Sequence, residues 1–296
     1  IEKWDVSSVE QFHYAFTNST KFNQDLSDWN VSSATNMLNM FNNTPALSTT
    51  NKGKIHESFA SNSNWPHDWR EFLVLDNSNF QSAVNLWFDN QADANKTYGH
   101  ISDWNTSAVG GMTDAFKDRT DFNEDISRWD VSNVTNLMRI FYNASSFNQD
   151  ISDWNTSSVT IMHEAFFGAT AFNQPIGKWD VSAVTTMNGM FRDTANFDAD
   201  LSSWNVSSVK DMSAMFYDTK SFNQDISNWN TSAVESMWLM FAGAEAFDQD
   251  ISNWNVSSIG LTSIGANGVG GMFSNSTALS NNNKGLIHQI FAPLQS

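Results

Sequence analysis

The stretch that decides the fold reads Phe147-Asn148-Gln149-Asp150-Ile151-Ser152-Asp153-Trp154-Asn155-Thr156-Ser157-Ser158-Val159, and Met162, Ala165 and Phe166 follow it. The same pattern recurs along the chain. Its tryptophan stands at Trp4, Trp29, Trp104, Trp129, Trp154, Trp179, Trp204, Trp229 and Trp254, with a spacing of 25 residues from Trp104 onwards. A fixed period of this length is the signature of a repeat protein, in which each copy forms one unit of a stack. We therefore expect nine copies of one coil.

Each copy predicts a strand followed by a short helix. Val159, Met162 and Phe166 lie at i, i+3 and i+7, which places them on one helical face that we expect to be buried. A serine that can cap this helix precedes the valine position in every copy, at Ser7, Ser32, Ser107, Ser132, Ser157, Ser182, Ser207, Ser232 and Ser257. The upstream Gln-Asp-Ile-Ser-x-Trp segment ends at a turn-prone Asp or Asn, which suits a short strand. The sequence therefore predicts an α/β repeat solenoid with one short parallel strand and one short helix per coil.

Breaks in the pattern divide the chain into five predicted segments. Residues 1–43 hold the last coils of a first array, 44–75 its C-terminal cap, and 76–103 an N-terminal helical cap of a second array. Residues 104–275 hold the second array of seven coils, and 276–296 part of its C-terminal cap. Because the sequence begins inside a repeat, we expect it to be a section of a longer protein.

Two features mark these caps. The motif Asn51-Lys52-Gly53-Lys54-Ile55-His56 recurs as Asn283-Lys284-Gly285-Leu286-Ile287-His288, and Trp65 and Trp69 complete the first copy. Such caps cover the open end of a stacked core. In the last coil, the stretch from Ile259 to Phe273 is seven residues longer than in its neighbours and contains five glycines, so we expect a looped-out insertion there rather than a helix.

The pattern seen at 147–166 and 222–241 resembles the 25- to 26-residue surface-protein repeats of unknown function found in bacterial surface lipoproteins, in mycoplasmas, and in marine microbes and algae. The resemblance covers about three quarters of the chain, with nine copies in register. It implies a relation to the leucine-rich repeats of bacterial surface antigens, a leucine-rich-repeat-like fold, an extracellular or cell-surface location, and a role in adhesion or surface structure. It implies no catalytic residues.

Composition excludes several classes of function. The formal net charge of −17 would repel nucleic acid and an anionic membrane surface. Cysteine is absent, so there is no disulfide framework and no thiolate metal site. The sequence contains no run of 18 apolar residues, so we expect no membrane span in this section of the protein.

Equivalent positions in successive coils predict columns of identical side chains. One such column contains Asp25, Asp125, Asp150, Asp200, Asp225 and Asp250, and Pro175 interrupts it. Stacked carboxylates repel one another, so either a cation such as Ca²⁺ lies between them or they face solvent and cap turns. The interruption at Pro175 favours the second interpretation, and a cation column at Asp125, Asp150, Asp200, Asp225 and Asp250 stays an alternative.

A second column invites comparison with the asparagine ladder of leucine-rich repeats. It contains Asn23, Asn123, Asn148, Asn173 and Asn223, and aspartate replaces asparagine at 198 and 248. A buried amide can pair with backbone groups of neighbouring coils, whereas aspartate can only accept. Both a ladder and its absence are compatible with the sequence.

Glycosylation sequons are abundant, and turn geometry alone explains most of their asparagines, because aspartate replaces asparagine after the tryptophan in three copies. The better glycosylation candidates are Asn18, Asn143 and Asn275, which fall in return loops.

The sequence predicts no enzyme. The six histidines show no metal-ligand spacing, and His56 with its counterpart His288 indicates packing in the caps. No nucleophile elbow, phosphate loop or metalloprotease helix occurs. We therefore expect no cofactor apart from the alternative of Ca²⁺.

The leading hypothesis is a non-enzymatic extracellular or cell-surface protein with a structural or adhesive role, assembling end to end into a fibre or binding other protein subunits. The main alternative is a module that binds surface glycans or cations. A third hypothesis is ice binding, although the threonine of Asn-Thr-Ser alternates with valine between coils and makes a poor lattice match.

Overall fold

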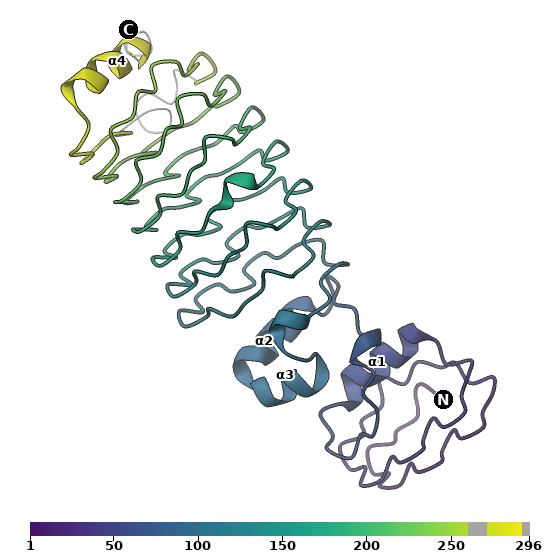
Figure 1. The fold of residues 1–296 in the computed structure, drawn as a ribbon. Helices are drawn as coiled ribbons and strands as arrows, with labels where there is room; N and C mark the ends of the chain where they lie inside the picture. Colours follow the sequence, from purple (N-terminus) through teal and green to yellow (C-terminus); the bar gives the residue numbers. More distant parts are fainter. Residues whose placement is uncertain (260–270, 292–296) are drawn as a thin grey trace. The chain divides into compact units, whose positions relative to one another are not determined.

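The computed structural model describes residues 1–259 and 271–291. The chain forms two compact units, residues 1–108 and 109–296, and each is described by itself. In the second unit, successive coils of the chain lie side by side as a stack (Figure 1). The first unit contains coils of the same kind followed by helices.

The coils are joined by single parallel bridges at one position of the repeat. In the second unit the bridges pair Gly111 with Asn136, Asn136 with Ile161, Ile161 with Thr186, Thr186 with Asp211, and Asp211 with Ser236. Each partner lies 25 residues after the previous one, so the sequence period is also the period of the stack. The first unit has a bridge of the same kind between Gln11 and Asn36.

The predicted fold class, a leucine-rich-repeat-like α/β solenoid with one strand and one helix per coil, is wrong. The described residues contain no β-strand, and the coils contain no α-helix. The segment predicted as a strand is a tight turn instead, since the Trp154 N–H donates to the Ile151 carbonyl at 3.2 Å and the Ser152 N–H donates to the Asp150 carboxylate at 2.9 Å. The backbone N–H groups of this segment therefore donate to side-chain oxygens and to turn carbonyls rather than to a neighbouring strand.

The predicted helix is absent because some backbone N–H groups of that segment donate to the next coil and others donate within their own coil. The N–H groups of Met162, Glu164 and Phe166 donate to the next coil, to the carbonyls of Thr186, Asn188 and Met190. The intervening N–H groups of Ala165 and Phe167 close turns onto Met162 and Glu164 within the coil. An α-helix needs each of these N–H groups for its own i−4 carbonyl, so the two patterns exclude each other.

Left-handed residues make this alternation geometrically feasible. Glu164 has φ 52° and Gly168 has φ 66°, and the equivalent positions of other coils also have positive φ. A right-handed helix cannot contain such residues. The prediction of which side chains face inward is nevertheless confirmed, because Val159, Met162 and Phe166 are fully buried.

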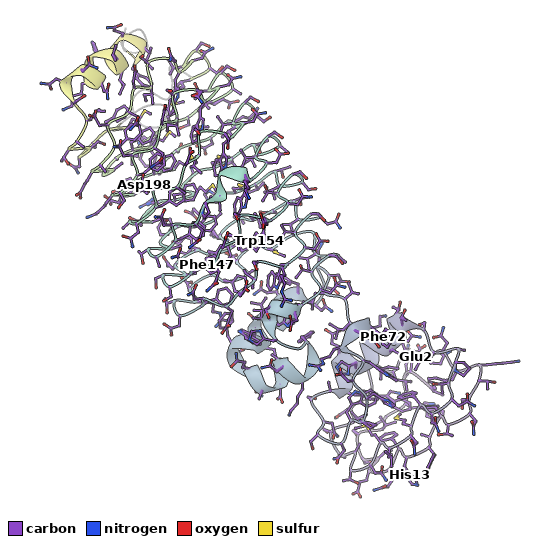
Figure 2. All side chains as sticks on the ribbon, viewed as in Figure 1. Glu2, His13, Phe72, Phe147, Trp154 and Asp198 are labelled. Atoms are coloured by element: carbon purple, nitrogen blue, oxygen red, sulfur yellow. The ribbon has the colours of Figure 1, made fainter. Side chains whose placement is uncertain are left out.

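The core of the second unit consists of continuous columns of phenylalanine. One column runs through Phe116, Phe141, Phe166, Phe191, Phe216 and Phe241, with ring centroids 5.3–5.8 Å apart. A second column runs through Phe122, Phe147, Phe172, Phe197, Phe222 and Phe247, with spacings of 5.7–6.2 Å. Figure 2 labels Phe147 of this column. Stacked pairs of this kind add about 0.5–1.5 kcal/mol each beyond the area they bury.

The α-helices described lie outside the coils, whereas some 3₁₀ segments lie within them. In the first unit, α1 spans Thr49–Phe59, α2 spans Phe80–Asp89 and α3 spans Gln91–Thr97, with 3₁₀ segments η1 at Arg70–Phe72 and η2 at Ile101–Asp103. In the second unit, η3 spans Ile176–Lys178 and α4 spans Asn281–Phe291. The Ser48 hydroxyl caps α1 by accepting from the Asn51 N–H at 3.2 Å. None of the helices described is long and apolar enough to cross a membrane.

The observed helices can be placed within the predicted segments, but this does not test the division into segments. Helix α1 falls within 44–75, α2 and α3 within 76–103, and α4 within 276–296. The five-segment division itself stays a prediction. Most of the expected insertion between Ile259 and Phe273 lies outside the described residues.

Candidate functional site

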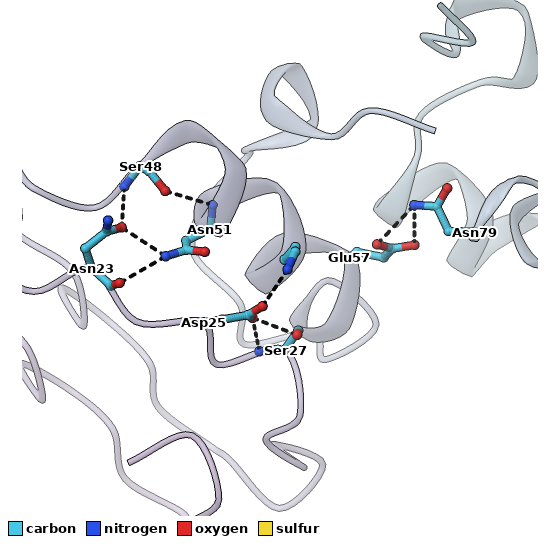
Figure 3. Close-up of polar contacts among 8 residues, drawn as sticks. Asn23, Asp25, Ser27, Ser48, Asn51, Glu57 and Asn79 are labelled. Atoms are coloured by element: carbon cyan, nitrogen blue, oxygen red, sulfur yellow. Dashed lines mark hydrogen bonds and ion pairs between the residues drawn. The ribbon is translucent and has the colours of Figure 1, made fainter. Parts of the chain in front are cut away.

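The aspartates of the proposed cation column cap turns. Asp125, Asp150, Asp200, Asp225 and Asp250 each accept the backbone N–H of the serine two residues later, at 2.8–2.9 Å. In the first unit Asp25 does the same with Ser27 and also pairs with Lys54 at 2.8 Å (Figure 3). Over residues 1–259 and 271–291, no group of three His, Cys, Asp or Glu side chains could hold a metal ion. The cation column itself stays an untested prediction.

These hydrogen bonds also lower the pKa values of the carboxyl groups. Hydrogen bonds from Ser127 hold the pKa of Asp125 below its ordinary value, and those from Ser152 do the same for the pKa of Asp150. A carboxylate that accepts two or more hydrogen bonds is stabilised in its charged form. The column is therefore ionised at neutral pH.

The asparagine column forms a ladder on the surface of the second unit. The Asn123 side-chain oxygen accepts from the Asn148 N–H, and Asn148 and Asn173 repeat this contact with the coils that follow, all at 2.9–3.0 Å. Asp198 and Asp248 continue it, because the contact needs only an acceptor. Unlike the expected ladder of buried amides, this one is exposed.

The serines predicted as helix caps have a different role. In each coil the Ser N–H donates to the Asp or Asn two residues before it, as Ser132 does to Asp130 at 2.9 Å. The Ser132 hydroxyl donates to the same oxygen at 2.6 Å rather than accepting from a helix N–H. The same backbone contact occurs at Ser7, Ser32, Ser107, Ser157, Ser182, Ser207, Ser232 and Ser257. The N-cap interpretation is wrong because there is no helix to cap; the serines stabilise Asx-type turns.

From Trp104 onwards, the repeated tryptophans are interior residues. Trp104, Trp129, Trp154, Trp179, Trp204, Trp229 and Trp254 are 3–4% exposed. The Trp179 indole stacks on that of Trp154 with centroids 6.2 Å apart, and the rings of Trp229 and Trp254 repeat this contact. These side chains contribute packing rather than a binding surface.

The three glycosylation candidates lie at turns of the chain. Asn18 and Asn275 are exposed, whereas Asn143 is partly buried and its amide donates to Asp118 at 2.9 Å. All three have positive φ, so turn geometry accounts for an asparagine at each. Glycosylation stays a prediction.

Some of the histidines and threonines singled out in the sequence are buried, and others are exposed. His56 is 2% exposed and accepts the Trp65 indole N–H at 3.0 Å, as expected for packing, whereas its counterpart His288 is exposed. Thr156 of the Asn-Thr-Ser motif is buried and donates to the Asp180 carbonyl at 2.9 Å. A buried threonine cannot order water on a surface, which removes the basis of the ice-binding hypothesis.

One surface of the second unit was missed by the sequence reasoning. We define the variable face as residues 113–118, 138–143, 163–168, 188–193 and 213–218, which are equivalent segments of five consecutive coils. Its outward side chains change from coil to coil, whereas the ladders repeat. The position of Lys117 in the first of these coils is filled by Tyr142, Phe167, Arg192 and Tyr217 in the next four. This departure from the repeat was the signal that could have found the surface.

The variable face carries an ordered column of aromatic and basic side chains. The rings of Tyr142 and Phe167 stack at 4.4 Å with an interplanar angle of 7°. Arg192 lies between two rings, 5.2 Å from that of Phe167 and 4.6 Å from that of Tyr217. At the other end, the Lys117 ammonium lies 5.5 Å from the centre of the Tyr142 ring. Stacking and cation–π contacts hold these half-buried side chains in place.

Charged groups flank this column. Arg139 pairs with Asp114 of the previous coil at 2.8 Å, and Arg192 pairs with Asp193 at 3.4 Å. Burial raises the pKa of Asp193, and the neighbouring Asp218 raises it further, while Arg192 opposes the shift. The variable face therefore combines aromatic rings with paired charges.

Comparison with known proteins gives a family. The family described as "Mycoplasma protein of unknown function, DUF285" matches residues 1–72, 54–177 and 162–285. No curated protein and no solved structure matches the chain. The three matches follow one another along nearly the whole sequence, so the chain is a tandem-repeat member of the DUF285 family.

Proposed function

We propose that this chain is a non-enzymatic adhesive repeat protein of the cell surface that binds a protein partner through the variable face. The observation that carries the proposal is the contrast between columns: ladder positions repeat from coil to coil, while the outward positions of the variable face differ. In repeat proteins the differences between copies commonly gather on the face that binds.

The composition of the face supports a protein partner. Tyrosine, phenylalanine and arginine are enriched where protein interfaces have their largest binding contributions. Because Arg192 already lies between the rings of Phe167 and Tyr217, little side-chain freedom is lost on binding. A second copy of the chain is one such partner and would give the expected fibre.

The cell-surface location is part of the proposal. It is supported by the resemblance of the repeats to those of bacterial surface lipoproteins, and by a charge of −17 that suits a solvated surface. Surface glycans are less well supported as partners. The faces of Tyr142 and Phe167 stack on each other, which leaves mainly their edges for a sugar.

A binding experiment with charge-matched variants tests the proposal. Arg192→Glu lies on the variable face, and Lys178→Glu makes the same charge change on a side chain that is 77% exposed and outside it. We expect the 296-residue chain to bind immobilised cell-surface and matrix proteins in biolayer interferometry. Arg192→Glu should weaken that binding at least about tenfold, while Lys178→Glu should leave it unchanged.

Two outcomes would count against the proposal. Equal binding by the two variants would remove the variable face as the binding surface. Antibody labelling of intact cells of the source organism addresses location, and a signal that appears only after permeabilisation would contradict a cell-surface protein.

A further inference from the structure

In each unit a run of coils ends in the same arrangement of residues. Each residue of the first set recurs 232 positions later: Met40 and Met272, Phe41 and Phe273, Leu47 and Leu279, Ser48 and Ser280, Asn51 and Asn283, Lys52 and Lys284, Gly53 and Gly285, Ile55 and Ile287, His56 and His288, Phe59 and Phe291. The two helices α1 and α4 carry the second half of each set. The ends of these two runs of coils can therefore be compared residue by residue.

The helices are attached to their coils by equivalent contacts. The Asn51 amide donates to the Asn23 carbonyl at 3.1 Å, and Figure 3 shows this contact beside that of Ser48. The Asn283 amide donates to the Asp248 carbonyl at 2.9 Å in the same way. The equivalence is therefore structural as well as sequential.

In the first unit this end is covered by residues 60–72, which we call the strap. Trp65 packs edge-on against Phe59 at 5.2 Å, and its indole N–H donates to the His56 Nδ1 at 3.0 Å. Trp69 lies 5.5 Å from Phe41, with His67 stacked on it at 4.5 Å. Two tryptophans and a histidine thus close the core of the first unit.

A glycine makes room for the backbone of the strap. A Cβ atom on Gly53 would collide with the Phe72 carbonyl oxygen and would lie 2.9 Å from the carbonyl carbon. Any larger residue at this position would push the strap away. At Gly285, by contrast, a Cβ atom would meet no described atom within 4 Å.

In the second unit the same surface is open within the described residues. A cavity of about 300 Å³ is lined by Met272, Phe273, Leu279, Lys284, Ile287, His288 and Phe291, and also by Gly271, Ser274 and Ser276. Phe273 is partly exposed and His288 is exposed, whereas His56 in the first unit is 2% exposed. Every residue that the strap contacts through a ring or an imidazole in the first unit has its counterpart in this lining.

We propose that this end of the second unit is a docking site for a polypeptide segment of the strap's chemistry, with two tryptophans flanking a histidine. The Trp-Pro-His-Asp-Trp segment occurs once in this sequence, at 65–69, and it is already seated in the first unit. The apolar lining supplies the affinity, and the His288 imidazole supplies the acceptor for an indole N–H.

The experiment adds a fluorescently labelled peptide of residues 60–72 to the 296-residue chain and measures anisotropy. We expect saturable binding, with hydrogen-exchange protection gained over 272–291. A peptide carrying Trp65→Ala and Trp69→Ala should bind at least about tenfold more weakly, because it lacks the rings that fill the cavity.

Two chain variants locate the site. Gly285→Ala favours helix α4 and so keeps the fold, yet its methyl group occupies the space that the strap backbone needs, and it should weaken binding at least about tenfold. His288→Leu removes the indole acceptor and should weaken binding severalfold. Absence of saturable binding, or equal binding by Gly285→Ala and the unsubstituted chain, would overturn the proposal. These results are independent of Arg192 and the variable face.

Discussion

The indole N–H of Trp179 donates to the backbone carbonyl of Ile151, in the preceding coil, at 3.0 Å. Trp154, Trp204, Trp229 and Trp254 repeat this contact with the carbonyls of Ile126, Ile176, Leu201 and Ile226. The repeated tryptophan therefore joins neighbouring coils through a hydrogen bond that is made inside the core.

Trp179→Phe should destabilise the second unit by about 2 kcal/mol. The change removes the hydrogen bond to Ile151 and leaves a small cavity beside a ring that is 3% exposed. Urea unfolding followed by circular dichroism measures the loss. Trp238→Phe is the control, because Trp238 is 39% exposed and should change the free energy of unfolding by less than about 0.5 kcal/mol. Equal effects would contradict the role of the inter-coil contact.

The asparagine ladder should tolerate aspartate and reject leucine. Asn173 offers its side-chain oxygen to the Asp198 N–H at 2.9 Å, and Asp198 performs the same task one coil later. Asn173→Asp should therefore stay within about 0.5 kcal/mol of the parent, whereas Asn173→Leu should cost about 1 kcal/mol. Chemical denaturation of both variants decides the matter. A loss on Asn173→Asp as large as that on Asn173→Leu would show that the amide N–H₂ group is needed.

Gly168, which has a left-handed backbone conformation, should be hard to replace, whereas Gly111, which does not, should be replaceable. Gly168 has φ 66°, and a Cβ there would crowd the Asn143 side chain, so Gly168→Ala should cost about 1–2 kcal/mol. At Gly111 a Cβ would meet nothing within 4 Å, and φ is not positive, so Gly111→Ala should be neutral or slightly stabilising. Thermal unfolding of the pair measures the difference. Similar melting temperatures for the two variants would argue against a left-handed residue at 168.

Acid should weaken the first unit before the second. Burial lowers the pKa values of His56 and His67; Asp68 opposes the shift at His56, while Arg70 adds to it there and Lys52 adds to it at His67. A folded-state pKa below the unfolded value of about 6.5 gives stability that is present above pH 6.5 and is lost as pH falls through the folded pKa. In the second unit the pKa values of Asp130 and Asp180 are lowered by hydrogen bonds from Ser132 and Ser182, so the stability that these groups contribute is lost only as pH falls below about 3.8.

Hydrogen exchange measured at pH 7, 5.5 and 4 separates the two units. Residues 41–69 should lose protection at pH 5.5, while residues 130–250 keep it. His56→Gln retains an acceptor for the Trp65 indole without a titrating group, and it should remove the loss at pH 5.5 that is due to His56. Parallel loss in both units would contradict this assignment.

Calcium should produce little effect on the stack. The carboxylates of the aspartate column are already engaged by serine N–H groups, as Asp200 is by Ser202 at 2.8 Å. Calorimetric titration with Ca²⁺ should therefore give no saturable heat, and the melting temperature should not change. A stoichiometric heat that Asp200→Asn reduces would instead support the cation column.

The regular backbone of the coils is where sequence reasoning failed. The spacing of Val159, Met162 and Phe166 correctly predicts which side chains are buried, because any compact turn that brings these positions inward satisfies the same pattern. It cannot report where the N–H groups go. The spacing is local and predicts a helix, but the backbone hydrogen bonds are made between coils. The Glu164 N–H, for example, donates to the Asn188 carbonyl, a residue that the local pattern does not connect to it.

For the surface, too, the sequence shows some features, and only the structure shows others. The asparagine column was visible as a recurring residue, but its position on the surface was not. The variable face was overlooked because it breaks the repeat, and only the stack brings residues as distant in sequence as Tyr142, Phe167 and Arg192 into one column.

By itself the sequence determined the period, the number of copies and the side chains that share the core, because identical apolar residues at a fixed spacing have to be buried against one another. Only the tertiary structure decided the form of each coil. There, alternate N–H groups bind the neighbouring coil, and residues at positive φ let the chain turn between those bonds, so that neither a helix nor a strand can form.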